Sequence, residues 1–148
     1  MRHDSRLSRM LHVLIHMDRH DQRATSDTIA HMLGTNPVVV RRTLAGLRDQ
    51  GYVRSEKGHG GGWTLARPLH EISMRDIYQA LGEPPLFAIG LSNERPECLV
   101  EQAVNAALTD ALNNAEALLL ERLGAVTLAD LAADFDERYR AVMTQAPA

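Results

Sequence analysis

The stretch that decides the fold is GHGGGW, residues 58–63, in which three consecutive glycines lie between a histidine and the only tryptophan of the chain. Glycine accepts positive φ and lets the backbone approach another group closely, so such a run indicates a tight turn or an anion-binding loop. The flanking segments GYVRSEKG (51–58) and GWTLARP (62–68) are short and β-prone. Two such segments joined by a glycine-rich turn predict a β-hairpin.

A loop of the HGGG type can also supply backbone N–H groups to the oxyanion hole of lipases and esterases. Such an enzyme needs a serine in a G-x-S-x-G turn, and the nearest match, GLSNE at 90–94, lacks the second glycine. A chain of 148 residues is also short for a doubly wound sheet with helices on both faces. The sequence therefore argues against an enzyme, and we assign no catalytic residue.

Three helices are predicted ahead of the hairpin. Residues 7–17 carry apolar side chains at three- and four-residue spacings, and a short second helix is expected from about Thr25 to Gly34. Asn36-Pro37 is an N-cap followed by proline at the first helical position, so a third helix should run from there and stop before Gly51. Two short helices joined by a tight turn and followed by a hairpin form a winged helix-turn-helix, whose second helix can enter a DNA major groove.

Charge favours DNA as the partner of this first half. Residues 1–67 contain 11 Lys and Arg against 6 Asp and Glu, a net of +5, whereas residues 68–148 contain 5 against 13, a net of −8; together they give −3. Lysine and arginine neutralise phosphates, and the only lysine, Lys57, lies in the predicted wing. The outward residues that we expect to contact DNA from the third helix are Thr35, Asn36, Val38, Val39, Arg41 and Arg42, with Arg48 further along.

The segment TNPVVVRRTLAGLRDQGYVRSEKGHGGGWTLARPLHEISMRDIYQALGE (35–83) resembles the core of the Rrf-two (Rrf2) family of bacterial winged-helix transcription regulators. The shared pattern runs through L-x-x-x-G-[LY]-V to G-x-G-G-G-[YW]-x-L-A. The resemblance implies a homodimer that binds a double-stranded DNA operator of partial twofold symmetry, with the helix in the major groove and the wing at the minor groove. By position, it implies DNA contacts from Asn36, Val38, Val39, Arg41 and Arg42 on the helix and from Lys57, His59 and Gly60 in the wing.

This sequence differs from the cluster-binding members of that family. Those members carry three cysteines before the long dimer helix, whereas Cys98 is the only cysteine here. An iron–sulfur cluster takes four ligands, commonly all cysteine, so we expect no cofactor; a cluster would need several other ligands or a second subunit. Val39 and Arg41 also replace an aromatic residue and a carboxylate common in those members, so their operator cannot be transferred to this chain.

Two further groups of residues could carry chemistry. We expect Pro96 to start a helix and Cys98 to lie in its first turn, where the helix dipole lowers a thiol pKa and favours a redox-reactive thiolate. The alternative is a lone cysteine that packs as a small apolar residue, and nearby carboxylates would oppose the thiolate. His12, His16 and His20 are four residues apart on the first helix and could share a metal, but nothing evident completes a site, so a polar face is favoured.

The segment after Cys98 predicts a long helix with apolar residues at three- and four-residue spacings. Its expected dimerisation seam is Val100, Val104, Ala107, Ala111, Ala115 and Leu118. Small residues along a seam suit close packing against a partner helix, with packing inside the same chain as the alternative. Capping-box patterns at Ser73 and at Thr127 predict two more helices, the last of them either short or extended through Val142, and TQAPA (144–148) is expected to fray.

The sequence thus predicts a mainly α protein with a small β-hairpin. We expect a winged helix-turn-helix DNA-binding domain at 1–82, a linker or sensor loop at 83–97, and a dimerisation helix with a C-terminal helical segment at 98–148. The predicted function is a cytoplasmic, homodimeric repressor that responds to an oxidant through Cys98 or to an unknown small molecule; no apolar run is long enough for a membrane span. The alternatives are a winged-helix protein-interaction module without DNA binding, and an iron–sulfur or ligand-sensing regulator.

Overall fold

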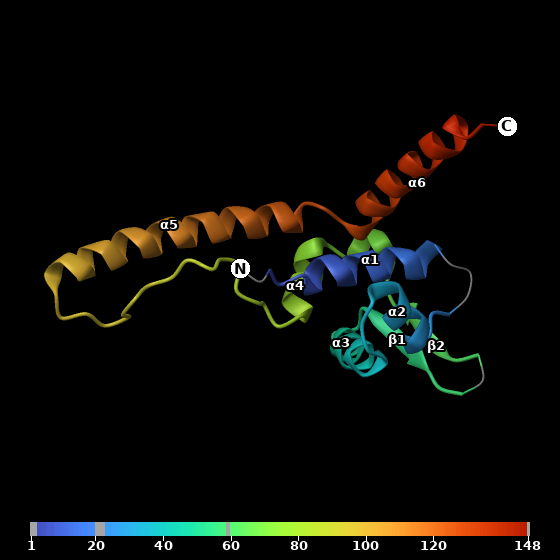
Figure 1. The fold of residues 1–148 in the computed structure, drawn as a ribbon, viewed down its shortest axis with the longest axis horizontal. Coiled ribbons are helices and arrows are strands. Elements are labelled where there is room, and N and C mark those ends of the chain that lie inside the picture. Colours follow the sequence, from blue (N-terminus) through green and yellow to red (C-terminus); the bar gives the residue numbers. More distant parts are fainter. Residues whose placement is uncertain (1–2, 20–22, 59, 148) are drawn as a thin grey trace.

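The computed structural model describes residues 3–19, 23–58 and 60–147, and its element order is that of a winged helix-turn-helix followed by two longer helices (Figure 1). The elements are α1 (Arg6–Arg19), α2 (Ser26–Leu33), α3 (Pro37–Asp49), β1 (Val53–Glu56), β2 (Gly62–Leu65), η1 (Leu69–Glu71), α4 (Met74–Ala80), α5 (Leu99–Gly124) and α6 (Leu128–Gln145). Strands β1 and β2 pair antiparallel, with Val53 opposite Leu65. The predicted fold class is confirmed.

Local capping explains where α2 and α3 begin and end. The hydroxyl of Thr25 accepts a hydrogen bond from the Thr28 N–H at 3.1 Å, and Gly34 ends α2 in the left-handed conformation, with φ of 64°. The side-chain oxygen of Asn36 then accepts from the Val38 N–H at 2.7 Å, with Pro37 as the first residue of α3. These caps satisfy N–H groups that a helix start leaves free, and they fix the turn between the two helices.

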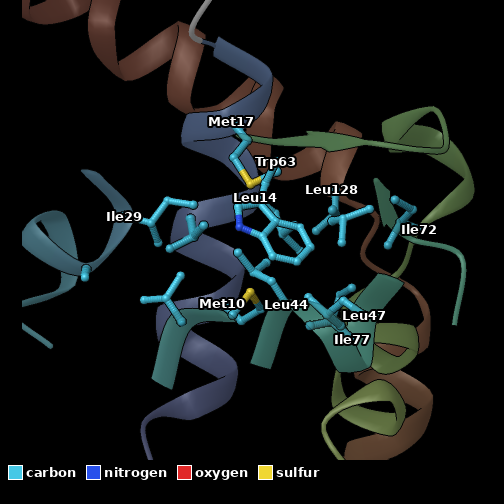
Figure 2. Close-up of a cluster of buried hydrophobic side chains, with 14 residues drawn as sticks. Met10, Leu14, Met17, Ile29, Leu44, Leu47, Trp63, Ile72, Ile77 and Leu128 are labelled. Atoms are coloured by element: carbon cyan, nitrogen blue, oxygen red, sulfur yellow. The ribbon is translucent and has the colours of Figure 1, made fainter. Parts of the chain in front are cut away.

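The core brings together side chains from α1, α2, α3, α4 and α6 around the indole of Trp63 (Figure 2). Trp63 is only 7% exposed, and its Nε1–H donates to the hydroxyl of Ser26 at 2.9 Å. Leu14 and Leu44 beside it are fully buried. The single tryptophan therefore attaches the hairpin to the helix-turn-helix, with its polar atom satisfied.

Helix α6 begins inside this same core. The Leu128 N–H donates to the Ile72 carbonyl at 2.8 Å, and the Leu128 side chain is fully buried. Further along, Arg19 at the end of α1 forms an ion pair with Asp136 at 2.7 Å. The helix then continues to Gln145, so the extension through Val142 is confirmed and the short alternative was wrong. Thr144 and Gln145 of TQAPA are also helical, because 18 residues propagate from a capping box at Thr127.

Helix α5 projects from the body as an arm, and residues 83–97 run outward beside it from α4 to its far end (Figure 1). The carboxamide of Asn105 donates to the Asn93 carbonyl at 2.7 Å, and that of Gln102 donates to the Pro96 carbonyl at 3.0 Å. Pro96 is therefore held alongside α5 rather than within it. The helix begins at Leu99 with Cys98 as its N-cap, so the expected start at Pro96 was wrong.

No helix of the described residues is long and apolar enough to cross a membrane.

Candidate nucleic-acid interface

Helix α3 buries one face and presents the other to solvent. Val40, Leu44 and Leu47 are buried in the core. Val38 and Val39 are each 49% exposed on the opposite side. Asn36, Arg41 and Arg42 are also exposed, and Thr35 is half-buried. The predicted recognition residues therefore share one accessible surface, as a helix that reads a major groove requires.

Arg48 faces the hairpin instead. Its guanidinium carbon lies 6.0 Å from the centre of the Trp63 ring, and its Nη1 donates to the hydroxyl of Ser55 at 3.4 Å. Its Nε is 3.6 Å from a carboxylate oxygen of Asp49. Arg48 therefore lies between α3 and the hairpin rather than on the outward face of α3.

A groove of about 440 Å³ separates α3 from the hairpin and the start of α2; we call it the wing groove. Its cationic residues are Arg41, Arg48 and Lys57, its acidic residues are Asp27 and Glu56, and its hydroxyl residues are Thr25, Ser26 and Ser55. Trp63, Ala45 and two glycines complete the lining. The groove combines cationic and hydroxyl donors, which are the groups that proteins most often use to bind DNA phosphates.

The glycines of GHGGGW are needed for two different reasons. Gly60 has φ of 78°, in the left-handed region that side-chain-bearing residues rarely adopt. At Gly61 a Cβ would lie 2.3 Å from the Glu56 carbonyl oxygen, and at Gly62 it would lie 2.8 Å from the Ala24 carbonyl oxygen. The turn is therefore tight and pressed against a neighbouring segment. His59 lies outside the described residues.

That neighbouring segment, just before α2, was missed by the sequence reasoning. The Trp63 N–H donates to the Ala24 carbonyl at 2.8 Å, so Ala24 adds a bridge to the edge of the hairpin. Arg23 forms an ion pair with Glu56 and donates through Nη1 to the Gly60 carbonyl at 3.2 Å. Only the basic character of the first half hinted at Arg23, because no local pattern ties it to a hairpin more than 30 residues away.

The other candidate residues lie on the arm or on α1. Cys98 is exposed, and its side chain makes no capping hydrogen bond. The rings of His12 and His16 are 4.7 Å apart, whereas His20 falls outside the described residues. Among the residues that the structure describes, no three His, Cys, Asp or Glu side chains gather closely enough to hold a metal ion. One subunit with a single cysteine therefore does not fit an iron–sulfur cluster.

The predicted dimer seam is open to solvent along its whole length. Val100 is 72% exposed, Val104 49% and Leu118 55%, and the three alanines between them are exposed as well. Among the described residues of α5, none is buried. The loop at 83–97 forms hydrogen bonds with Glu101, Gln102 and Asn105 of α5, and Gln102 and Asn105 project from the face opposite the seam at 3.6 residues per turn. Among the residues that the structure describes, none buries the seam.

A winged helix with an accessible recognition helix, a basic groove beside the wing and a projecting helical arm is the architecture of a transcription regulator. The family model described as "Rrf2: Iron-dependent Transcriptional regulator" matches residues 3–134, and the chain belongs to this family. The chain is 30% identical over 129 residues to YwnA of Bacillus subtilis (strain 168), a candidate HTH-type transcriptional regulator; the match covers 86% of this chain and 95% of YwnA.

Solved structures agree with the fold. A candidate transcriptional regulator from Lactobacillus plantarum superposes with a TM-score of 0.74 at 24% identity, covering 94% of this chain and 95% of the other. A candidate DNA-binding protein superposes with a TM-score of 0.68 at 26% identity, covering 86% of this chain and 98% of the other. The family resemblance inferred from the wing and its flanking helices is confirmed, as is the expectation that the chain is a regulator and not an enzyme.

Proposed function

We propose that this transcription regulator is a homodimeric, sequence-specific DNA-binding repressor, with α3 in the major groove and the wing at the minor groove. The observation that carries the proposal is the accessible face of α3, where Arg41 and Arg42 are exposed and Arg41 lines the wing groove, which continues to Lys57 in the wing. Arginine on a recognition helix can read guanine bidentately, and cations beside it neutralise phosphates. A protein-interaction module has no need for this arrangement of charge.

The exposed seam of α5 supports the dimer. Exposed apolar patches of this kind on one helix face mark interaction surfaces, and alanines allow two helices to approach closely. Two copies joined through α5 would present two copies of α3 to successive half-sites of one operator, about one helical turn of DNA apart. A dimer that covers such an operator excludes other proteins from it, which is the basis for assigning repression.

The arm also carries the proposed sensor. Cys98 is exposed at the start of α5, beside the loop at 83–97, so an oxidant can reach its thiol. Peroxide would join the two Cys98 thiols of a dimer in a disulfide: two S–H bonds break, one S–S bond forms, and the peroxide is reduced to two water molecules. A small molecule bound at the loop is the alternative signal.

The test is a titration of the purified protein on DNA from upstream of its own gene. We expect the double variant Arg41→Ala, Arg42→Ala to bind at least tenfold more weakly, with a salt slope smaller by about two. The matched control, Arg138→Ala with Arg140→Ala on α6, removes the same charge far from α3 and should bind like the wild type. Unchanged affinity and salt slope in the α3 variant would rule out α3 as the recognition helix.

The sensor is tested on the same DNA with reductant or mild peroxide. If Cys98 is the sensor, peroxide should abolish binding of the wild type and leave Cys98→Ser unaffected. If the two proteins respond alike, the thiol is not the sensor, and the loop at 83–97 becomes the place to search for a ligand.

A further inference from the structure

Glu56 places a negative charge where the proposed function needs positive charge. It lies at the edge of the wing groove, next to Lys57 in the chain and in the same groove as Arg41 and Arg48. A carboxylate a few ångströms from a DNA phosphate is repelled, and it also cancels part of the cationic field that draws DNA to the groove. Glu56 would therefore weaken binding unless another group compensates its charge.

Arg23 supplies that compensation. Its guanidinium forms an ion pair with the Glu56 carboxylate and donates to the Gly60 carbonyl at the tip of the hairpin, at 3.2 Å. The chain can pass this closely because residue 62 is glycine: a Cβ there would lie 3.1 Å from the Cβ of Arg23. One side chain from outside the hairpin thus neutralises the acidic residue of the wing and bonds to its tip.

We propose that Arg23 is a positioning residue for DNA binding, which acts by neutralising Glu56 so that Lys57 and Arg48 receive a backbone phosphate in the wing groove. This inference rests on the proposed DNA-binding function and assigns that groove to a phosphodiester. The side chains of Arg23 and Glu56 are 41% and 55% exposed, and exposed ion pairs contribute little to folding stability. The effect of Arg23 should therefore appear in DNA binding and in its salt dependence, not in thermal unfolding.

The experiment compares the full-length wild type with Arg23→Gln, Glu56→Gln, the double variant and a control. The control is Arg138→Gln, which removes the same charge from another exposed ion pair, with Asp134 at 3.0 Å on α6. Affinity for a labelled duplex from upstream of the protein's gene is measured by fluorescence anisotropy at salt concentrations from about 50 to 200 mM. Circular dichroism melting of each protein checks folding.

We expect Arg23→Gln to bind roughly fivefold more weakly at the low-salt end, with a salt slope smaller by about one, because Glu56 is then uncompensated. Glu56→Gln should bind more tightly by a similar factor, with a slope larger by about one, because Arg23 is then free to attract phosphate. The double variant should return to the affinity and salt slope of the wild type. The control Arg138→Gln should have the same affinity and salt slope as the wild type. A purely structural role of Arg23 would not give this rescue.

Two results would overturn the inference while leaving the proposed function intact. In one, the double variant binds as weakly as Arg23→Gln, which means that Arg23 acts without Glu56. In the other, Arg23→Gln behaves like Arg138→Gln. If Arg23→Gln fails to fold, the test rests on Glu56→Gln, which retains Arg23. The inference requires Glu56→Gln to bind the duplex more tightly than the wild type does. If the folded wild type does not bind the duplex, both the proposed function and this inference fail.

Discussion

The winged-helix body and the α5 arm use their apolar residues in opposite ways. In the body, side chains from five helices and the hairpin close around Trp63, and Leu14, Leu44 and Leu128 are fully buried. In the arm, 26 residues form a helix of which none is buried, and Leu99 and Val100 are more than 70% exposed. The body therefore buries its apolar residues within one chain, whereas the seam of the arm stays exposed, as interaction surfaces do.

The largest expected effect is on the free energy of unfolding, and it should differ between a leucine of the body and a leucine of the arm. Leu44→Ala removes a fully buried side chain and should lower the free energy of unfolding by about 2–5 kcal/mol, at every protein concentration. Leu118→Ala removes a side chain that is 55% exposed and should change only the part of the stability that depends on protein concentration. Urea unfolding at two well-separated concentrations measures both. A concentration-independent loss of similar size in Leu118→Ala would mean that the seam packs inside its own chain.

A charge in the seam should weaken dimerisation through the arm and leave the fold of the body intact. Val104→Asp places a carboxylate in the proposed interface, where burying it unpaired is unfavourable, and should weaken dimerisation at least tenfold. Sedimentation equilibrium measures the dimer affinity, and near-UV circular dichroism of Trp63 reports on the body. Asn113→Asp adds the same charge on the opposite face of α5 and should leave dimerisation nearly unchanged. Equal effects of the two variants would exclude this seam.

The sequence predicted what depends on local chemistry. The N-caps at Asn36, Ser73 and Thr127 lie where the patterns predicted, because a cap is made by residues within three positions of one another. Periodicity likewise identified the apolar seam of α5 and the buried face of α3. It could not say which of these two apolar faces packs within the same chain. The DNA contacts assigned to α3 and to the wing, His59 included, stay predictions.

Features that depend on how the chain returns on itself were missed. The contact of Arg23 with Glu56 exists only because the hairpin folds back against the segment before α2. The burial of Leu128 exists only because the chain comes back along α5 to the body. The start of α5 was placed too early because Gln102, four residues after Cys98, holds the Pro96 carbonyl beside the helix. Contacts between distant segments leave no periodic signal in one sequence.

Glycine substitutions should show a smaller contrast between the two regions. Gly61→Ala puts a Cβ 2.3 Å from the Glu56 carbonyl oxygen, so the turn must shift, at a cost of about 1–3 kcal/mol. Gly90→Ala, in the loop beside the arm, meets nothing within 4 Å and should be neutral or stabilising by up to about 1 kcal/mol. Thermal melting ranks the two proteins. If Gly90→Ala were the more damaging substitution, the tight packing of the wing described above would be wrong.

The smallest contrast compares one hydroxyl in each region. Ser26 accepts the Nε1–H of Trp63 at 2.9 Å, and Trp63 is 7% exposed, so Ser26→Ala leaves a nearly buried donor without its acceptor. The expected loss of unfolding free energy is about 1–2 kcal/mol, together with a shift in the emission maximum of the only tryptophan.

On the arm, Ser92 donates to Glu101 at 3.1 Å with both groups accessible to solvent, so water replaces the lost bond in Ser92→Ala, and the change should stay within about 0.5 kcal/mol. Urea unfolding with tryptophan fluorescence detects both variants in one experiment. If Ser92→Ala costs as much as Ser26→Ala, the loop and α5 form a cooperative unit with its own stability. In that case the arm is ordered before a second chain covers its seam, and dimerisation joins two preformed helices instead of ordering them.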